Sequence, residues 1–128
     1  MENYLQSENK TLKNIFKGVF ISFITTVLFL LIYSCVLVYT DTNENTMNVV
    51  ITLITAISIL IGSSIGNYKI RKNGLLNGGA IGGIYLLIIY FISSILNWNF
   101  SLNVQSLILI GAGIVFGILG GIIGVNKK

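Results

Sequence analysis

The sequence contains no proline, no histidine and a single cysteine, and only 9% of its 128 residues are charged. Because proline is the commonest cause of sharp helix kinks, any long helices in this chain are expected to run without them. A lone cysteine cannot form an internal disulfide, and the chain has no cluster of histidine and cysteine for zinc. A water-soluble domain carries about a quarter charged residues. These absences exclude a soluble enzyme, a DNA-binding domain and a disordered tail.

Apolar residues are abundant instead: 54% of the chain is hydrophobic, and the mean hydropathy is +0.87. Uncharged stretches cover 18–40, 45–68 and 73–126. The first two are each long enough for one bilayer-spanning helix, which needs about 20 apolar residues. The third is too long for one span and contains Asn97–Asn103, where three asparagines and a serine favour a turn.

The pattern therefore predicts an all-α integral membrane protein, a bundle of four transmembrane helices in a single domain over 1–128. We expect a cytoplasmic N-terminal segment at 1–15, followed by helices at roughly 16–40, 46–68, 74–96 and 104–125.

The charges predict the orientation of these spans. Four spans place every basic residue on one side of the membrane: Lys10, Lys13, Lys17, Lys69, Arg71, Lys72, Lys127 and Lys128. The opposite side carries only Asp41 and Glu44. The positive-inside rule makes the basic side cytoplasmic, so both termini are expected in the cytoplasm. Because the cations are split among three short juxtamembrane segments, we expect them to touch anionic lipid headgroups and not nucleic acid.

Cys35 allows two interpretations. Ile32-Tyr33-Ser34 before it loosely matches a bacterial lipoprotein cleavage box. The bulky Tyr33 and the apolar residues after Cys35 favour the other interpretation, a small hydrophobic side chain buried in a helix. The apolar run is also longer than the 7–15 residues usual for a signal peptide, and no small-residue cleavage site follows it.

The predicted spans lack the groups that membrane catalysis needs. None has a charged residue in its interior, so proton-coupled transport and proteolysis by Ser-His or paired Asp have no residues to use. General acid–base catalysis in the membrane interior could rest only on tyrosines, namely Tyr33, Tyr85 or Tyr90. We therefore expect no enzyme, no catalytic residue, no metal and no cofactor.

Glycines recur at intervals of four along the last three helices, and residues four apart share a helix face. The predicted packing glycines are Gly62, Gly66, Gly74, Gly78, Gly82, Gly113, Gly117 and Gly121. Rows of small residues let helix backbones approach closely in lipid. The favoured interpretation is packing inside one bundle, and the alternative is an exposed groove that binds another subunit.

A faint internal repeat relates the two halves of the chain. A shift of about 60 residues places Gly18 on Gly78, and a shift of about 58 places Gly62 on Gly120. The repeat would relate two helical hairpins in parallel about the membrane normal. Chance also produces such matches in a chain this rich in isoleucine and glycine.

The connection between the second and third helices is the most distinctive segment. Its polar and basic residues are Asn67, Lys69, Arg71, Lys72, Asn73 and Asn77. One interpretation is a helix-hairpin turn whose cations reach the lipid headgroups. The other is a docking site for a cytoplasmic or membrane partner.

A family resemblance rests on the segments around the connection between the second and third helices. They are the end of the second helix, Ile61-Gly62-Ser63-Ser64-Ile65-Gly66, then the basic turn, then the run Asn73-Gly74-Leu75-Leu76-Asn77-Gly78-Gly79-Ala80-Ile81-Gly82-Gly83-Ile84-Tyr85. They resemble the YrzE-like membrane proteins of low-GC Gram-positive bacteria, a family of unknown function. The resemblance implies a multi-pass protein of the bacterial cytoplasmic membrane and brings no catalytic residue with it.

Two other classes of small four-span protein do not fit. Dual-topology fluoride channels need balanced positive charge on both sides, and small multidrug exporters need a glutamate within the membrane. We expect a non-catalytic accessory or assembly factor that acts through glycine-mediated helix packing, with lipid and another membrane protein or a second copy as partners. The alternative is a small oligomeric channel, holin-like pore or passive permease. Its candidate polar residues are Ser22, Thr25, Thr26, Thr52, Thr55 and Ser58.

Overall fold

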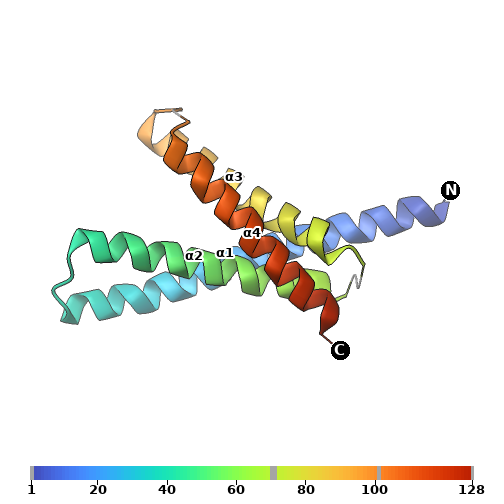
Figure 1. The fold of residues 1–128 in the computed structure, drawn as a ribbon, viewed down its shortest axis with the longest axis horizontal. Helices are drawn as coiled ribbons and strands as arrows, with labels where there is room; N and C mark the ends of the chain where they lie inside the picture. The colour runs from blue at the N-terminus through green and yellow to red at the C-terminus, as the bar shows by residue number, and fades with distance from the viewer. Residues whose placement is uncertain (1, 70–71, 101, 128) are drawn as a thin grey trace.

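The computed structural model describes residues 2–69, 72–100 and 102–127, and four helices make up almost all of them. These are α1 (Glu2–Tyr39), α2 (Glu44–Tyr68), α3 (Gly74–Asn97) and α4 (Val104–Asn126), shown in Figure 1. Each helix is long and apolar enough to cross a membrane, and the described residues contain no strand. The predicted all-α fold with four candidate membrane spans is confirmed.

The helix ends agree with the sequence prediction except at the start of α1. Helices α2, α3 and α4 lie within two residues of the predicted bounds, but α1 begins at Glu2 and not near residue 16. The prediction was wrong here because loss of charge marks where the lipid begins, whereas a helix continues until a breaker stops it. Residues 2–17 contain neither glycine nor proline, so nothing in them ends the helix. At 1.5 Å per residue α1 is about 57 Å long, well beyond the roughly 30 Å of a hydrocarbon core.

The four helices form two antiparallel hairpins, α1 with α2 and α3 with α4. Figure 1 shows that the hairpins cross near the end that holds both termini and diverge toward the α1–α2 and α3–α4 connections. Helix α2 packs along α4, and α3 touches both α1 and α2, whereas α1 and α4 make no contact within the described ranges. The bundle is therefore closed at one end and open at the other.

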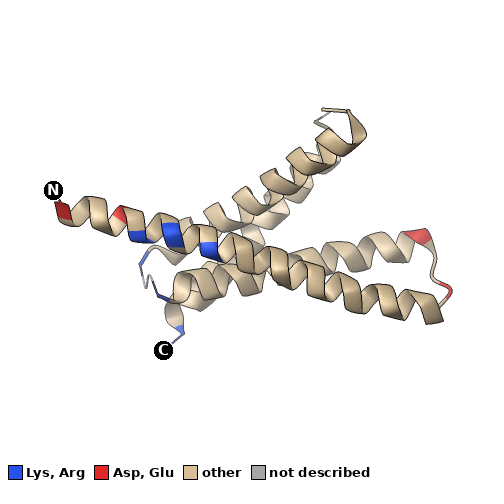
Figure 2. Ribbon diagram, turned by 180° about the vertical axis from the view of Figure 1, so that it is seen from behind, with Lys and Arg blue, Asp and Glu red and all other residues tan. Residues whose placement is uncertain are grey.

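Basic residues gather at one end of the bundle. Figure 2 shows the lysines at the end with the termini and the α2–α3 connection, where α1 also carries Glu2 and Glu8, and an acidic pair without lysines near the α1–α2 connection at the opposite end. That pair is Asp41 and Glu44. A chain that crosses the membrane four times with all its basic residues on one side would show this distribution of charge.

The buried interior is small, as expected for helices that face lipid on most sides. One cluster joins Ile15 and Val19 of α1 to Ile81 of α3. A second joins Ile59 of α2 to Tyr85 and Leu86 of α3. Because the hydrophobic effect does not drive helices together in lipid, close backbone packing and hydrogen bonds must hold this bundle.

Two residues with left-handed backbone conformation make the sharp ends of α3. Asn73, before the helix, has φ 49°, and Trp98, after it, has φ 51°. Asparagine tolerates this region because its short side chain can bond locally, whereas a bulky residue is unusual there. Trp98 is 90% exposed, and an exposed aromatic residue at a helix end is typical of a membrane surface.

Candidate functional site

The α3–α4 interface is built from two facing rows of glycine. Gly74, Gly78 and Gly82 of α3 meet Gly113, Gly117 and Gly121 of α4. A Cβ added to Gly78 would clash with the carbonyl oxygen of Gly117, and one added to Gly117 would clash with that of Gly78. The same reciprocal fit joins Gly74 to Gly121. The backbones touch, so only glycine fits at these positions.

A second glycine row of α4 packs on α2. A Cβ at Gly120 would lie 2.5 Å from the carbonyl oxygen of Leu60, and one at Gly124 would clash with that of Ser64. Beside them the hydroxyl of Ser63 donates to the carbonyl oxygen of Gly117 at 2.6 Å. This bond is a polar link between the two hairpins.

Helix α1 approaches α2 through Gly62 and Gly66. A Cβ at Gly62 would lie 2.6 Å from the carbonyl oxygen of Gly18, and one at Gly66 would lie 3.0 Å from its Cα. A Cβ added to Gly18 would lie 2.7 Å from the side chain of Ile81. These contacts form the point at which α1, α2 and α3 cross.

All eight glycines singled out by spacing therefore lie buried at helix contacts within the chain. The predicted set of eight left out Gly18, Gly120 and Gly124, although the last two share the interval of four. Gly111 differs from all of these because nothing lies within 4 Å of an added Cβ. Gly62 and Gly120, which the predicted repeat places on each other, differ in environment. Gly62 packs on α1 within its own hairpin, whereas Gly120 packs on α2 of the first hairpin.

The hydroxyl groups inside the spans bond mainly to their own helices. Ser22 and Thr26 donate to carbonyl oxygens one turn earlier, at 3.0 and 2.8 Å. Thr25, Thr52, Thr55 and Ser58 do the same. Besides the bond from Ser63 to Gly117, a 2.7 Å hydrogen bond between the hydroxyls of Thr26 and Tyr85 joins two helices, α1 and α3. Ser22 and Ser58 are fully buried and Thr52 is exposed, so the six candidate pore residues do not share one surface.

The residues of the predicted docking turn do not lie on a single surface either. Asn67 is fully buried, and its side-chain amide donates to the carbonyl oxygen of Ser63 at 2.9 Å. Lys69, Lys72 and Asn73 are exposed, and the side chain of Asn77 donates to the carbonyl oxygen of Lys72 at 3.2 Å. Arg71 lies outside the described residues.

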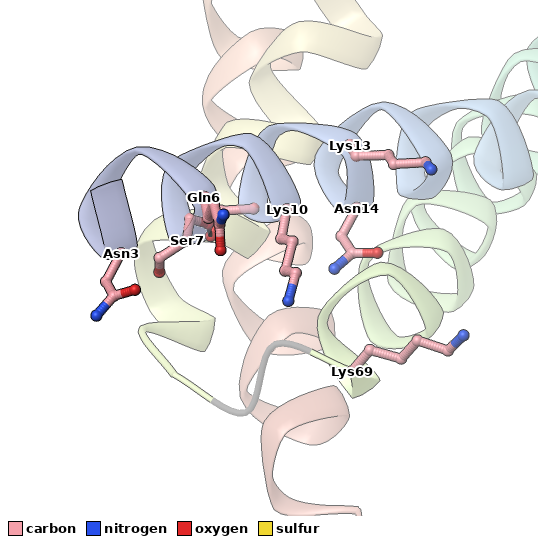
Figure 3. Close-up of a pocket in the computed structure, with 8 residues that line it drawn as sticks. Asn3, Gln6, Ser7, Lys10, Lys13, Asn14 and Lys69 are labelled. Carbon is pink, nitrogen blue, oxygen red and sulfur yellow. Dashed lines mark hydrogen bonds between the residues drawn. The ribbon is translucent and has the colours of Figure 1, made fainter. Parts of the chain in front are cut away.

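A basic cleft lies between the N-terminal part of α1 and the end of α2 (Figure 3). Its volume is about 490 Å³, and its lining residues are all polar or basic: Asn3, Gln6, Ser7, Lys10, Thr11, Lys13, Asn14 and Lys69. Figure 3 shows Lys10 and Asn14 pointing from α1 toward the α2–α3 connection, with Lys69 at its start. Because α1 was expected to begin near residue 16, the sequence did not predict this cleft.

Two apolar crevices open where the hairpins diverge. The α1–α3 crevice has a volume of about 410 Å³ and is lined by Phe23, Thr26, Val27, Leu30, Tyr85, Ile89, Ile92, Ser93, Leu96 and Asn97. A narrower crevice of about 180 Å³ lies among α2, α3 and α4, and Ile89 lines both. The hydrogen bond between Thr26 and Tyr85 lies on the wall of the larger one.

Two further expectations concern the burial of Cys35 and the presence of a metal site. Cys35 is exposed, so the expectation of a buried thiol was wrong. It is not among the residues of α1 that are buried against the other helices. Within the described ranges no group of three His, Cys, Asp or Glu residues could hold a metal ion.

Four apolar helices, two hairpins joined by glycine contacts and charge confined to the ends define a small multi-pass membrane protein. Its family follows from the sequence. The chain belongs to the family described as "Protein of unknown function (DUF3792)", whose model matches residues 11–124. No curated protein and no solved structure matches the chain.

Proposed function

We propose that this protein is a non-catalytic accessory or assembly factor of the bacterial cytoplasmic membrane, with both termini in the cytoplasm. The orientation is supported by the lysines at one end of the bundle and the acidic pair at the other. The bacterial membrane and the YrzE-like relationship are supported by the glycine-rich stretch from Ile61 to Tyr85.

The α1–α3 crevice is the observation that carries the proposal. Apart from Gly111, the glycines of α2, α3 and α4 face neighbouring helices of the same chain, so they leave no row of open glycines for a partner. The diverging ends of the hairpins, by contrast, present apolar walls with a few hydroxyl and amide groups, including Ser93 and Asn97. Such a surface suits a transmembrane helix of another protein, which needs van der Waals contact and an occasional interhelical hydrogen bond.

The alternative of an oligomeric pore has weaker support. A conducting path needs polar groups that continue through the membrane. The hydroxyls of Ser22, Thr25 and Thr55 are occupied by carbonyl oxygens of their own helices, and the crevices are mostly apolar.

Photo-crosslinking in native membranes tests the accessory function. A photoreactive amino acid at Ile92, which is 48% exposed and lines the α1–α3 crevice, should capture a different membrane protein. The matched control is Leu76, which is 68% exposed on the same helix but does not line that crevice. Equal capture from both positions, or from neither, would contradict the proposal.

A liposome assay separates the accessory factor from the pore. We expect the purified protein in liposomes to pass neither ions nor small dyes, because its hydroxyls are satisfied within the helices. Reproducible single-channel conductance that Thr25→Leu or Thr55→Leu abolishes would establish the pore instead.

A further inference from the structure

The lining of the basic cleft comes mostly from the N-terminal part of α1. Seven of its eight lining residues lie at positions 3, 6, 7, 10, 11, 13 and 14. These positions fall on one side of a helix, since the spacing repeats every three to four residues. Every one of the seven is polar or basic, and the eighth, Lys69, comes from the end of α2.

Uncharged backbone contacts hold the two sides of the cleft in place. A Cβ on Gly66 would lie 3.0 Å from Gly18 and 3.2 Å from the carbonyl oxygen of Asn14. Helix α1 therefore touches α2 at Gly66, two residues before α2 ends at Tyr68, and its N-terminal part runs past Lys69. The packing of glycine, and not any attraction between charges, brings these lysines to one cleft.

The cleft has a surplus of positive charge. Lys10, Lys13 and Lys69 line it, and none of its described lining residues is acidic. The two carboxylates of this part of α1, Glu2 and Glu8, are not among the lining residues. Three ammonium groups around one cleft with no lining carboxylate give it a net positive charge, which attracts an anion. The amide and hydroxyl groups of Asn3, Gln6 and Ser7 add hydrogen-bond donors.

The depth of the cleft points to the source of the anion. The first buried residue of α1 is Ile15, next to the cleft residues Lys13 and Asn14. On another side of the same two turns, Leu12 is 53% exposed and Phe16 is 65% exposed. Exposed apolar side chains there are stabilised by the edge of the hydrocarbon layer, whereas lysines extend their ammonium groups toward the headgroups. In a membrane this placement would set the cleft at the level of the lipid phosphates.

From this placement we propose that the cleft binds the phosphate of an anionic phospholipid headgroup, held by Lys10, Lys13 and Lys69. The inference does not depend on the proposed accessory function, because a lipid can be bound whether or not a partner protein is.

The test measures binding of short-chain phosphatidylglycerol to the full-length protein in neutral detergent micelles by isothermal titration calorimetry. Replacing the three lysines together (Lys10→Gln, Lys13→Gln and Lys69→Gln) should raise the dissociation constant about tenfold or more, given the usual attraction of an anionic lipid surface for each lysine. Glutamine has nearly the helix propensity of lysine, so α1 should stay folded, and the melting temperature of the variant checks this.

A matched variant removes the same amount of charge elsewhere on the same end of the bundle. Lys17→Gln, Lys72→Gln and Lys127→Gln together should change the dissociation constant by less than about threefold, because none of these lysines lines the cleft. Equal weakening in both variants would mean a diffuse basic surface and would overturn the proposal. So would equal binding of phosphatidylcholine, or displacement of the lipid by inorganic phosphate at a similar concentration, which would indicate a site for soluble phosphate.

Discussion

At the scale of single residues, a glycine's effect on stability depends on what faces it and not on the glycine itself. Gly117 and Gly111 are both in α4, yet an added Cβ would clash with the backbone of Gly78 at the first and meet open space at the second. Gly117→Ala should therefore lower the free energy of unfolding by about 1–3 kcal/mol, as overpacking does in a close-packed interface. Gly111→Ala should leave it within about 0.5 kcal/mol. Denaturation of the purified variants in mixed micelles measures both, and similar losses at the two positions would contradict the packing described for α3 and α4.

The hydrogen bond between Thr26 and Tyr85 gives a second residue-scale prediction. Tyr85 is fully buried, and its ring centroid lies 4.8 Å from that of Phe23. Tyr85→Phe keeps the ring and removes the hydroxyl, while Thr26→Val removes the partner. A double-mutant cycle should give a coupling of about 0.6 kcal/mol, the average for interhelical hydrogen bonds in membrane proteins. A coupling of zero would mean that the two hydroxyls do not bond to each other in the membrane.

At the scale of helices, the N-terminal part of α1 can be tested apart from its span. Asn9→Pro removes a backbone hydrogen bond and clashes with the carbonyl of Leu5, at a cost of about 3 kcal/mol. The residues before position 9 are too few to form a helix on their own in water, so they should unfold while the spans remain intact. Far-UV circular dichroism should lose helical signal with no change in the melting temperature of the bundle. Asn9→Ala is the control that keeps the signal, and an unchanged signal in the proline variant would argue that this segment is not helical.

The positions of the spans could be predicted from the sequence, whereas their mutual packing could not. Hydropathy and turn residues located α2, α3 and α4 because the length of a bilayer span restricts the choices. The start of α1 was missed because polar helix-forming residues leave no mark in hydropathy. The divergence of the hairpins was also missed: Gly117 and Gly120 are three residues apart, but one faces α3 and the other α2. Spacing alone marks both as packing residues and does not say which helix each one meets.

At the scale of the whole molecule, the separation of charge predicts the topology. Reporter fusions at Thr42 and Asn99 should be read outside the cytoplasm, and fusions at Asn73 and at the C-terminal Lys128 inside it, because the basic residues flank one end of the spans. Activity of a cytoplasmic reporter at Asn99 would refute the four-span path across the membrane.

The two-hairpin construction also bears on how the protein is made. The close contact of Gly18 with Gly62 lies within the first hairpin, and that of Gly78 with Gly117 lies within the second, so each pair of helices can close before it meets the other. During synthesis the first hairpin could complete its own contacts while the second is still on the ribosome. The Ser63 hydroxyl and the row from Gly120 to Gly124 then join two finished halves. A gene divided between the codons for Lys72 and Asn73 should accordingly yield two polypeptides that find each other in the bilayer and copurify.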